Sequence, residues 1–187
     1  MTGSVLQVRR LERCDLEART AWFNDPIVAA NMLMDYPASL ADTEKWFADT
    51  RLDRRRRDFS LWVQRSGEIC AMAGLTDVDE RNRRAEMYVV VAPNMRRQGI
   101  GATAVAWITN YGFAEMSLDR VYLFTLRQNH NAQSLYRRLG FCEEGVLRRH
   151  VLHRGTRHDR LVFGLLKDEW SGLPWAHDAP LPMEIRV

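Results

Sequence analysis

This sequence has no long apolar run, no N-terminal pattern typical of a signal peptide, and no closely spaced cysteines. No stretch approaches the roughly 18 consecutive apolar residues of a membrane helix, and the N-terminal segment lacks the apolar core of a signal peptide. The three cysteines lie far apart, without the spacing of a zinc site or of a disulfide framework. We therefore expect a cytoplasmic protein that does not associate with membranes, holds no metal and keeps its thiols free and buried.

Lysine is also scarce. Lys45 and Lys167 are the only lysines, so 25 of the 27 basic residues are arginine, and the 24 acidic residues leave a net charge of +3. Arginine is the better partner for phosphate and carboxylate groups. The arginine run at 54–57 raises the alternative of a nucleic-acid-binding module. Since Asp53 and Asp58 flank the run, and no recognition helix or RNP-like strand is recognisable, we expect a solvated turn and no nucleic-acid partner.

The length of 187 residues and the 46% share of hydrophobic residues suit one folded domain. The periodicities predict an α+β domain, whose mixed and mostly antiparallel central sheet is flanked by helices in the order βααβββαβαββ. Asp25 and Pro26 add a helix-start signal. We expect the domain to take residues 1–167 and to leave a Trp- and Pro-containing tail at 168–187. The expected strands are 5–11, 59–63, 69–78, 85–91, 121–126 and two within 141–166, and the expected helices are 16–23, 40–50, 100–111 and 131–139.

A glycine-containing loop between a predicted strand and a predicted helix is the most informative segment, with the sequence VAPNMRRQGIGA at 91–102. Gly99 and Gly101 let the backbone approach a ligand closely, and the N–H groups that open the helix have no partner within it. Together with the helix dipole and with Arg96 and Arg97, they predict a phosphate site. The loop is neither a P-loop nor a dinucleotide fingerprint. From these residues alone, a purely structural turn is an equal alternative.

The same string resembles the acyl-CoA signature of the GNAT acetyltransferase superfamily. Arg96, Gly99 and Gly101 fall on its Arg-x-x-Gly-x-Gly core, whereas Arg97 stands where glycine is frequent. A second string, NHNAQSLYRRLGF at 129–141, resembles the family motif N-x-x-A/S-x-x-L-Y-x-x-x-G-F. The later segment is similar to the RimJ/RimL-like branch of the superfamily. The resemblance covers nearly the whole chain, and it implies the GNAT fold, with acetyl-CoA as co-substrate and no metal.

The resemblance also implies direct transfer of the acetyl group to an amine, with roles for particular residues. Tyr136 falls on the family tyrosine that protonates the departing thiolate; the alternative is a helix packing face. Glu86 is the candidate base, directly or through water; the alternative is a solvated carboxylate paired with Arg83 or Arg84. Cys142 offers a covalent route, but its surroundings favour a core residue. The implied cofactor-binding residues are Val89, Val91, Arg96, Arg97, Gln98, Gly99, Ile100, Gly101, Ala102, Thr103, Asn129, Ser134 and Arg138.

The acceptor in this family commonly lies between the loop that joins the first two helices and the late strands. Here those segments offer Asp35, Tyr36 and His150 as substrate-binding residues. Because the helix–helix loop has one carboxylate and the late segment is rich in arginine and histidine, we expect a small-molecule amine, such as an amino sugar or an aminoglycoside-like acceptor. Alternatives are a polyamine acetyltransferase and a protein N-terminal acetyltransferase of the RimJ/RimL kind. A homodimer is one option for the assembly.

Overall fold

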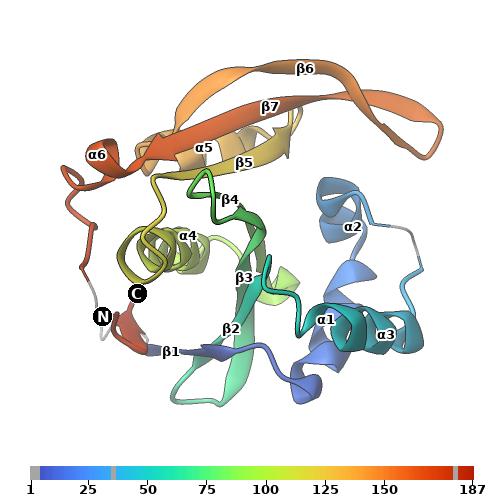
Figure 1. Cartoon of the computed structure of the whole chain (residues 1–187). Helices are drawn as coiled ribbons and strands as arrows, with labels where there is room; N and C mark the ends of the chain where they lie inside the picture. Colours follow the sequence, from blue (N-terminus) through green and yellow to red (C-terminus); the bar gives the residue numbers. More distant parts are fainter. Residues whose placement is uncertain (1–4, 35–36, 179–180) are drawn as a thin grey trace.

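The described part of the chain is built on one mixed sheet of eight strands, in the order β6-β7-β5-β4-β3-β2-β1-β8 (Figure 1). The computed structural model describes residues 5–34, 37–178 and 181–187. Every neighbouring pair of strands is antiparallel except β4 and β5, so the prediction of a mixed and mostly antiparallel sheet is confirmed. The strands are β1 (Val5–Arg10), β2 (Arg57–Val63), β3 (Glu68–Asp79), β4 (Arg84–Val91), β5 (Arg120–Leu126), β6 (Cys142–His153), β7 (Thr156–Leu166) and β8 (Glu184–Arg186).

Helices cover both faces of the sheet (Figure 1). Three helices follow β1, where the sequence pattern predicts two, because Asp25 caps a separate helix by accepting hydrogen bonds from the N–H groups of Ile27 and Val28. Among the described residues, none of the helices is long and apolar enough to cross a membrane. The helices are α1 (Leu16–Phe23), α2 (Pro26–Met32), α3 (Leu40–Thr50), α4 (Ile100–Asn110), α5 (His130–Arg138) and α6 (Lys167–Trp170), with a π-helical turn at Tyr111–Glu115.

Alternation along β4 divides its side chains between two apolar clusters. Met87, Val89 and Val91 pack with residues of α4 and α5 on one face. Tyr88 and Val90 pack with residues of α1 to α3 on the other. Since successive side chains of a strand point to opposite faces, the even-numbered residues of β4 lie on the α1–α3 face. The central strand is thus fixed by packing on both sides.

The sheet divides between β4 and β5. These parallel strands pair at only three positions, which end with Glu86 opposite Tyr122. Beyond that point β4 pairs with β3 alone and β5 with β7 alone, within the part of the chain that the structure describes. The facing edges of both strands therefore keep backbone N–H and C=O groups without a strand partner. Figure 1 shows the two halves of the sheet separating there.

Residues 168–178 and 181–187 pack along the domain, and the chain ends on its sheet. The ring of Trp170 is buried beside Phe113, and its Nε1 donates to Asn110 Oδ1 at 2.6 Å. Trp107 Nε1 of α4 donates to the carbonyl of Pro182 at 2.9 Å, and β8 then pairs with β1. The pattern of the sequence does not predict this strand, because three residues are too few for an alternation to be recognised.

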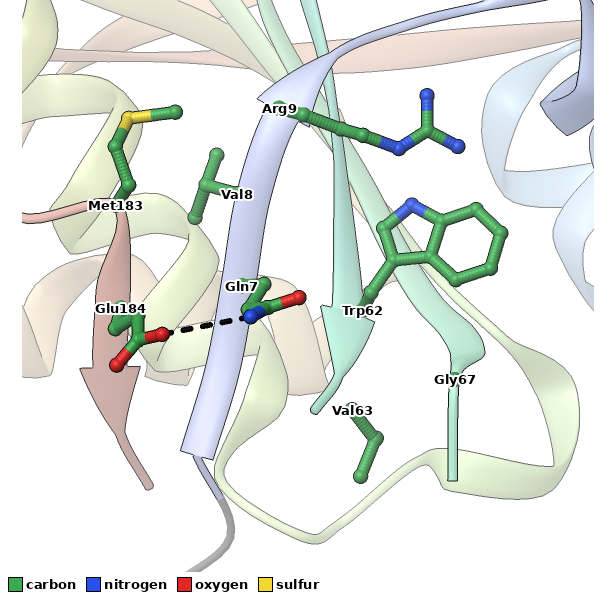
Figure 2. Close-up of a pocket in the computed structure, with 8 residues that line it drawn as sticks. All are labelled: Gln7, Val8, Arg9, Trp62, Val63, Gly67, Met183 and Glu184. Carbon is green, nitrogen blue, oxygen red and sulfur yellow. Dashed lines mark hydrogen bonds between the residues drawn. The ribbon is translucent and has the colours of Figure 1, made fainter. Parts of the chain in front are cut away.

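The β8 edge forms one wall of a shallow pocket of about 330 Å³ (Figure 2). Arg9 lies over the Trp62 ring at 4.7 Å, and Gln7 donates to Glu184 at 3.4 Å. None of the predicted site residues lines this pocket, so it is separate from the site described below. Its lining consists of Gln7, Val8, Arg9, Trp62, Val63, Gly67, Met183 and Glu184.

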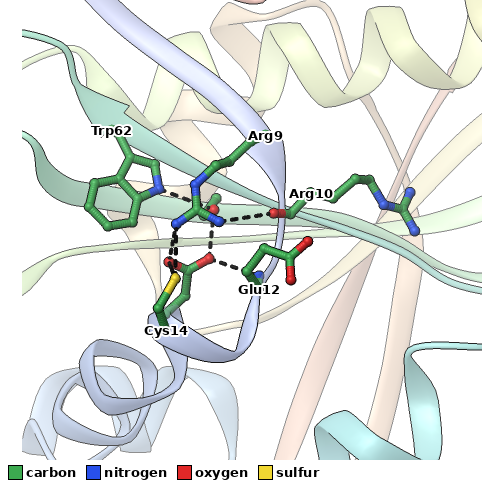
Figure 3. A network of polar contacts seen from close by, with 7 residues as sticks. Arg9, Arg10, Glu12, Cys14 and Trp62 are labelled. Atoms are coloured by element: carbon green, nitrogen blue, oxygen red, sulfur yellow. Dashed lines mark hydrogen bonds and ion pairs between the residues drawn. The ribbon is translucent and has the colours of Figure 1, made fainter.

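The fully buried Asp15 connects the start of α1 to the sheet. It belongs to the network of polar contacts around Arg9, Glu12 and Cys14 that Figure 3 shows. Its carboxylate accepts hydrogen bonds from Arg9 at 2.7 Å, from the Glu12 N–H at 2.9 Å and from the Ser60 hydroxyl at 2.9 Å. Replacement of Asp15 by alanine leaves these donors without an acceptor. We expect Asp15→Ala to lower the free energy of unfolding by about 2 kcal/mol, measured by urea denaturation.

The matched control is Glu17→Ala, an exposed carboxylate in the same helix, which we expect to change the free energy of unfolding by less than about 0.5 kcal/mol. Equal denaturation midpoints for the two variants would show that the Asp15 network adds nothing to stability.

Candidate active site

The loop between β4 and α4 has the backbone geometry of an anion site. Gly99 has a φ of +83°, in the left-handed region that favours glycine. A Cβ on Gly101 would lie 3.4 Å from Val91 Cγ2 and 3.8 Å from Leu135 Cδ2, so α4 begins close against β4 and α5. In the first turn of α4 the N–H of Thr103 bonds to the carbonyl of Gly99. The N–H groups before it, those of Ile100, Gly101 and Ala102, have no partner within the helix and are free to face a phosphate.

The two arginines of this loop differ in their surroundings. Arg96 pairs with Asp25 at 3.0 Å, which connects the loop to the start of α2. Arg97 and Gln98 are exposed, and within the described ranges the Arg97 guanidinium has no ion pair. Of the two predicted phosphate contacts, Arg97 is therefore the one whose charge is available, whereas Arg96 holds the loop in place.

The second motif lies on α5 and the turn that precedes it. Asn129 caps the helix by accepting a hydrogen bond from the Ala132 N–H at 3.2 Å, which is the local role that asparagine often has. Ser134 and Arg138 are exposed on the same helix. Tyr136 is buried, with its ring near those of Phe141 and Phe163.

The Tyr136 hydroxyl is the group of this helix that is predicted to have a chemical role. It makes no hydrogen bond to any described residue, so it is available to a ligand. Burial raises the pKa of Tyr136 to about 12. The phenol therefore keeps its proton throughout the neutral range, and it can donate a hydrogen bond or a proton to an anion that forms beside it, such as a thiolate.

Glu86 lies at the last position at which β4 pairs with β5, on the opposite face from Val89. Its side chain is 28% exposed, and its charged neighbours are Arg160 of β7, at 3.8 Å, and Asp77. Burial raises the pKa of Glu86, although Arg160 acts to lower it. The alternative pairing with Arg83 or Arg84 is wrong, because those arginines pair with Asp119 and Asp79.

An aromatic and charged surface surrounds Glu86 on the α1–α3 face. Tyr122, directly opposite Glu86, donates to Asp77 at 3.1 Å, and the Arg160 guanidinium lies 4.3 Å from the Phe124 ring. Sequence reasoning did not select these residues. Alternation along β5 puts Tyr122 and Phe124 on one face, but it does not reveal that β7 adds Arg160 to them.

The predicted acceptor residues lie in two regions. His150 is exposed on β6, with its ring 6.0 Å from that of Phe124, so it belongs to the same surface as Arg160. Asp35 and Tyr36 lie outside the described residues. In the described part of the chain, no three His, Cys, Asp or Glu side chains are grouped so that they could hold a metal ion.

Two further expectations concern cysteine and arginine. Cys142 is exposed, as is Cys14, so the prediction of buried thiols holds only for Cys70. The reason is that Cys142 begins β6, an edge strand of the sheet.

The arginine run at 54–57 is held by partners of its own: Arg55 pairs with Asp77, Arg56 pairs with Asp58, and Arg57 donates to the carbonyls of Arg54 and Arg56.

Comparisons with known proteins agree with this geometry. The family model of the GNAT acetyltransferase domain matches residues 6–142. The putative ribosomal N-acetyltransferase YdaF of Bacillus subtilis (strain 168) is 34% identical over 106 residues, so the match spans 57% of this chain and 58% of that protein. The spermidine N(1)-acetyltransferase of Escherichia coli (strain K12) is 28% identical over 154 residues, 76% of this chain and 75% of that protein.

A solved structure shows the same fold. The spermidine N-acetyltransferase from Vibrio cholerae in complex with CoA and spermine has a TM-score of 0.83 at 24% identity, covering 88% of this chain and 96% of that chain. The predicted superfamily, fold class and acyltransferase activity are thereby confirmed. This chain belongs to the GNAT family of acetyltransferases, and acetyl-CoA is its co-substrate.

Proposed function

We propose that this chain transfers the acetyl group of acetyl-CoA directly to the primary amine of a small molecule, at the point where β4 and β5 separate. The observation that carries the proposal is the position of Glu86. It stands at the last pair before the strands diverge, on the face opposite the cluster that contains Val89, Val91 and Tyr136. Donor and acceptor can thus approach the same opening from two faces, which favours direct transfer over a covalent enzyme intermediate.

The donor half of the site uses the α4 side of this opening. The N–H groups from Ile100 to Ala102, with Arg97, suit the diphosphate of acetyl-CoA. The unpaired edge of β4 around Val89 and Val91 suits the amides of its pantetheine arm, since an extended chain can add to a free strand edge. Gln98, Thr103, Ser134 and Arg138 stay predicted contacts of the same ligand.

The chemistry requires two proton transfers. A protonated amine has no free lone pair, so Glu86 takes one proton from the acceptor nitrogen, directly or through a water. The nitrogen then forms a bond to the acetyl carbon while the carbon–sulfur bond breaks. Tyr136 supplies the proton that the departing thiolate takes up, and it regains one from solvent.

The acceptor we propose is a polar amine with hydroxyl or acidic groups, such as an amino sugar. The carboxylates near Glu86 support this, because Asp77 and Asp79 are each paired with an arginine and offer little net negative charge to a polycation. A polyamine is the second candidate, since spermidine acetyltransferases are among the relatives. The expected homodimer stays a prediction, and light scattering after size exclusion measures it.

An amine panel tests this proposal. Amino sugars, aminoglycosides, polyamines, amino acids and N-terminal peptides are each incubated with acetyl-CoA, and the release of free CoA thiol is measured together with the mass of the acetylated product. We expect release with small polar amines. Release with N-terminal peptides alone would contradict the small-molecule acceptor, and no release with any amine would contradict the enzyme activity.

Arg97 provides a test of the donor half. If its guanidinium binds a phosphate in both the ground state and the transition state, Arg97→Gln raises the KM for acetyl-CoA by about 5-fold and leaves kcat unchanged. Steady-state kinetics measure both constants. The comparison variant is Arg96→Gln, which loses the pair with Asp25 and should lower the melting temperature, whereas Arg97→Gln should not. An unchanged KM in Arg97→Gln would remove this residue from the phosphate site.

A further inference from the structure

Arg160 of β7 is a partly buried arginine whose hydrogen-bond donors are unused. Its side chain is 21% exposed, and the guanidinium stacks over the Phe124 ring at 4.3 Å. It makes no hydrogen bond to any residue in the described ranges, and the nearest carboxylate oxygen, Glu86 Oε1, lies 3.8 Å away, beyond hydrogen-bond distance. A guanidinium keeps its charge at any physiological pH, so this one is a fixed cation with five donors to offer.

Two other arginines on the same half of the sheet have partners of their own. Arg120 forms two hydrogen bonds to Glu144, and Arg127 pairs with Asp159 at 3.3 Å. Structural ion pairs therefore account for those two side chains, and they do not account for Arg160. Stacking on Phe124 fixes the plane of its guanidinium, which prepares it for a planar, bidentate partner.

The Glu86 carboxylate has the complementary property. It accepts no hydrogen bond from any described residue, and it is 28% exposed. The Glu86 carboxylate and the Arg160 guanidinium thus lie 3.8 Å apart at the proposed reaction point. Neither has a hydrogen-bond partner among the described residues, and both are partly exposed to solvent. A bare ammonium acceptor would have to approach Glu86 against the repulsion of Arg160. An acceptor that carries its own anionic group next to the amine would satisfy both side chains.

We propose that Arg160 binds a carboxylate next to the reacting amine, so that the acceptor of this enzyme is an amino acid or a similar amino acid-like compound. This assignment rests on the proposed acetyl transfer at Glu86. When the carboxylate binds, Arg160 exchanges its weak contact with Glu86 for two hydrogen bonds to the ligand. Glu86 then has no cationic competitor and faces the ammonium group from which it must take a proton.

Matched pairs of acceptors test the assignment. Glycine, serine and phenylalanine are each compared with their own amide, which has nearly the same shape but no negative charge. In the wild-type enzyme we expect kcat/KM to favour the acid over the amide for at least one pair. In Arg160→Gln we expect this acid-to-amide ratio to fall by about 10-fold, while kcat/KM for the amide stays within about 3-fold. Arg160→Lys, which keeps the charge but not the bidentate geometry, should retain part of the ratio.

Arg157→Gln is the control, because it removes an exposed arginine from the same strand and should leave the ratio unchanged. A ratio that is the same in Arg160→Gln and in the wild type, or a wild-type preference for the amides, would overturn the assignment. Calorimetric titration of the acids and amides into the protein, with CoA present, measures carboxylate binding independently of acetyl transfer. It therefore distinguishes a wrong assignment of Arg160 from a wrong proposed function. Binding of the acid that Arg160→Gln abolishes supports the assignment even where no acetyl transfer occurs, and equal binding by both proteins contradicts it.

Discussion

Tyr136→Phe lowers kcat by about 100-fold and leaves the KM for acetyl-CoA within about 3-fold of the wild-type value. The physical reason is that the substitution removes the hydroxyl group, which is the proton donor, and little else. The ring remains, so its packing against Phe141 and Phe163 is retained. The hydroxyl has no partner among the described residues, so its loss breaks no internal hydrogen bond. The departing thiolate alone loses its donor, and steady-state kinetics with both substrates measure the effect.

The control for Tyr136→Phe is Tyr111→Phe. Tyr111 is half-buried and stacks on Trp107, away from the second motif. We expect its kcat to equal that of the wild type. If Tyr136→Phe also keeps the wild-type kcat, the tyrosine is a packing residue, and the thiolate takes its proton from elsewhere.

Glu86→Gln lowers kcat/KM for the acceptor by about 100-fold near pH 7, and the activity returns at high pH. Glutamine cannot take a proton, so the variant depends on the fraction of acceptor that is already neutral. That fraction rises with pH, and the loss shrinks accordingly. The measurement is a profile of kcat/KM against pH for the wild type and the variant, with Glu80→Gln as the control for an exposed carboxylate.

The burial of Glu86 determines how wild-type activity changes with pH. Burial raises the pKa of Glu86 above its ordinary value, and Arg160 opposes that rise. Because Glu86 must be ionised to act as a base, wild-type activity falls as the pH drops through this raised pKa. Removal of Arg160 raises the pKa further, so the acidic limb of Arg160→Gln should move to higher pH. A Glu86→Gln profile identical to that of the wild type would contradict the role of Glu86.

The parts of the site that depend on local backbone were predictable from the sequence. The loop around Gly99 and Gly101 adopts the expected conformation, because a positive φ and a close helix approach require glycine wherever they occur. The helix that carries Tyr136 begins at His130, one residue before the expected start at 131. Such features need only a few consecutive residues, and two motifs in the family order were sufficient to identify the superfamily.

The features that depend on long-range pairing were not predictable. Arg160 meets Glu86 only because β7 pairs with β5 and β5 with β4, and neither pairing can be derived from the spacing of residues. Arg96 meets Asp25 across 71 positions of the chain, a pair that residue spacing does not reveal, and its contact with the cofactor stays a prediction. The pairing of β8 with β1 has the same origin.

The arginine excess also has an explanation in the fold. Many of these side chains pair with acidic residues that lie far away in sequence, as Arg55 does with Asp77 and Arg120 with Glu144. Exposed pairs of this kind contribute little stability each. They do neutralise carboxylates such as Asp77, which lies near the proposed acceptor site at Glu86.

The central claim is direct transfer of the acetyl group between two bound substrates. Initial rates measured while the concentrations of acetyl-CoA and acceptor are both varied test it most directly. Direct transfer requires both substrates on the enzyme together, so we predict double-reciprocal lines that intersect. Parallel lines would show that CoA leaves before the amine arrives, and would contradict the account in favour of an acetylated enzyme.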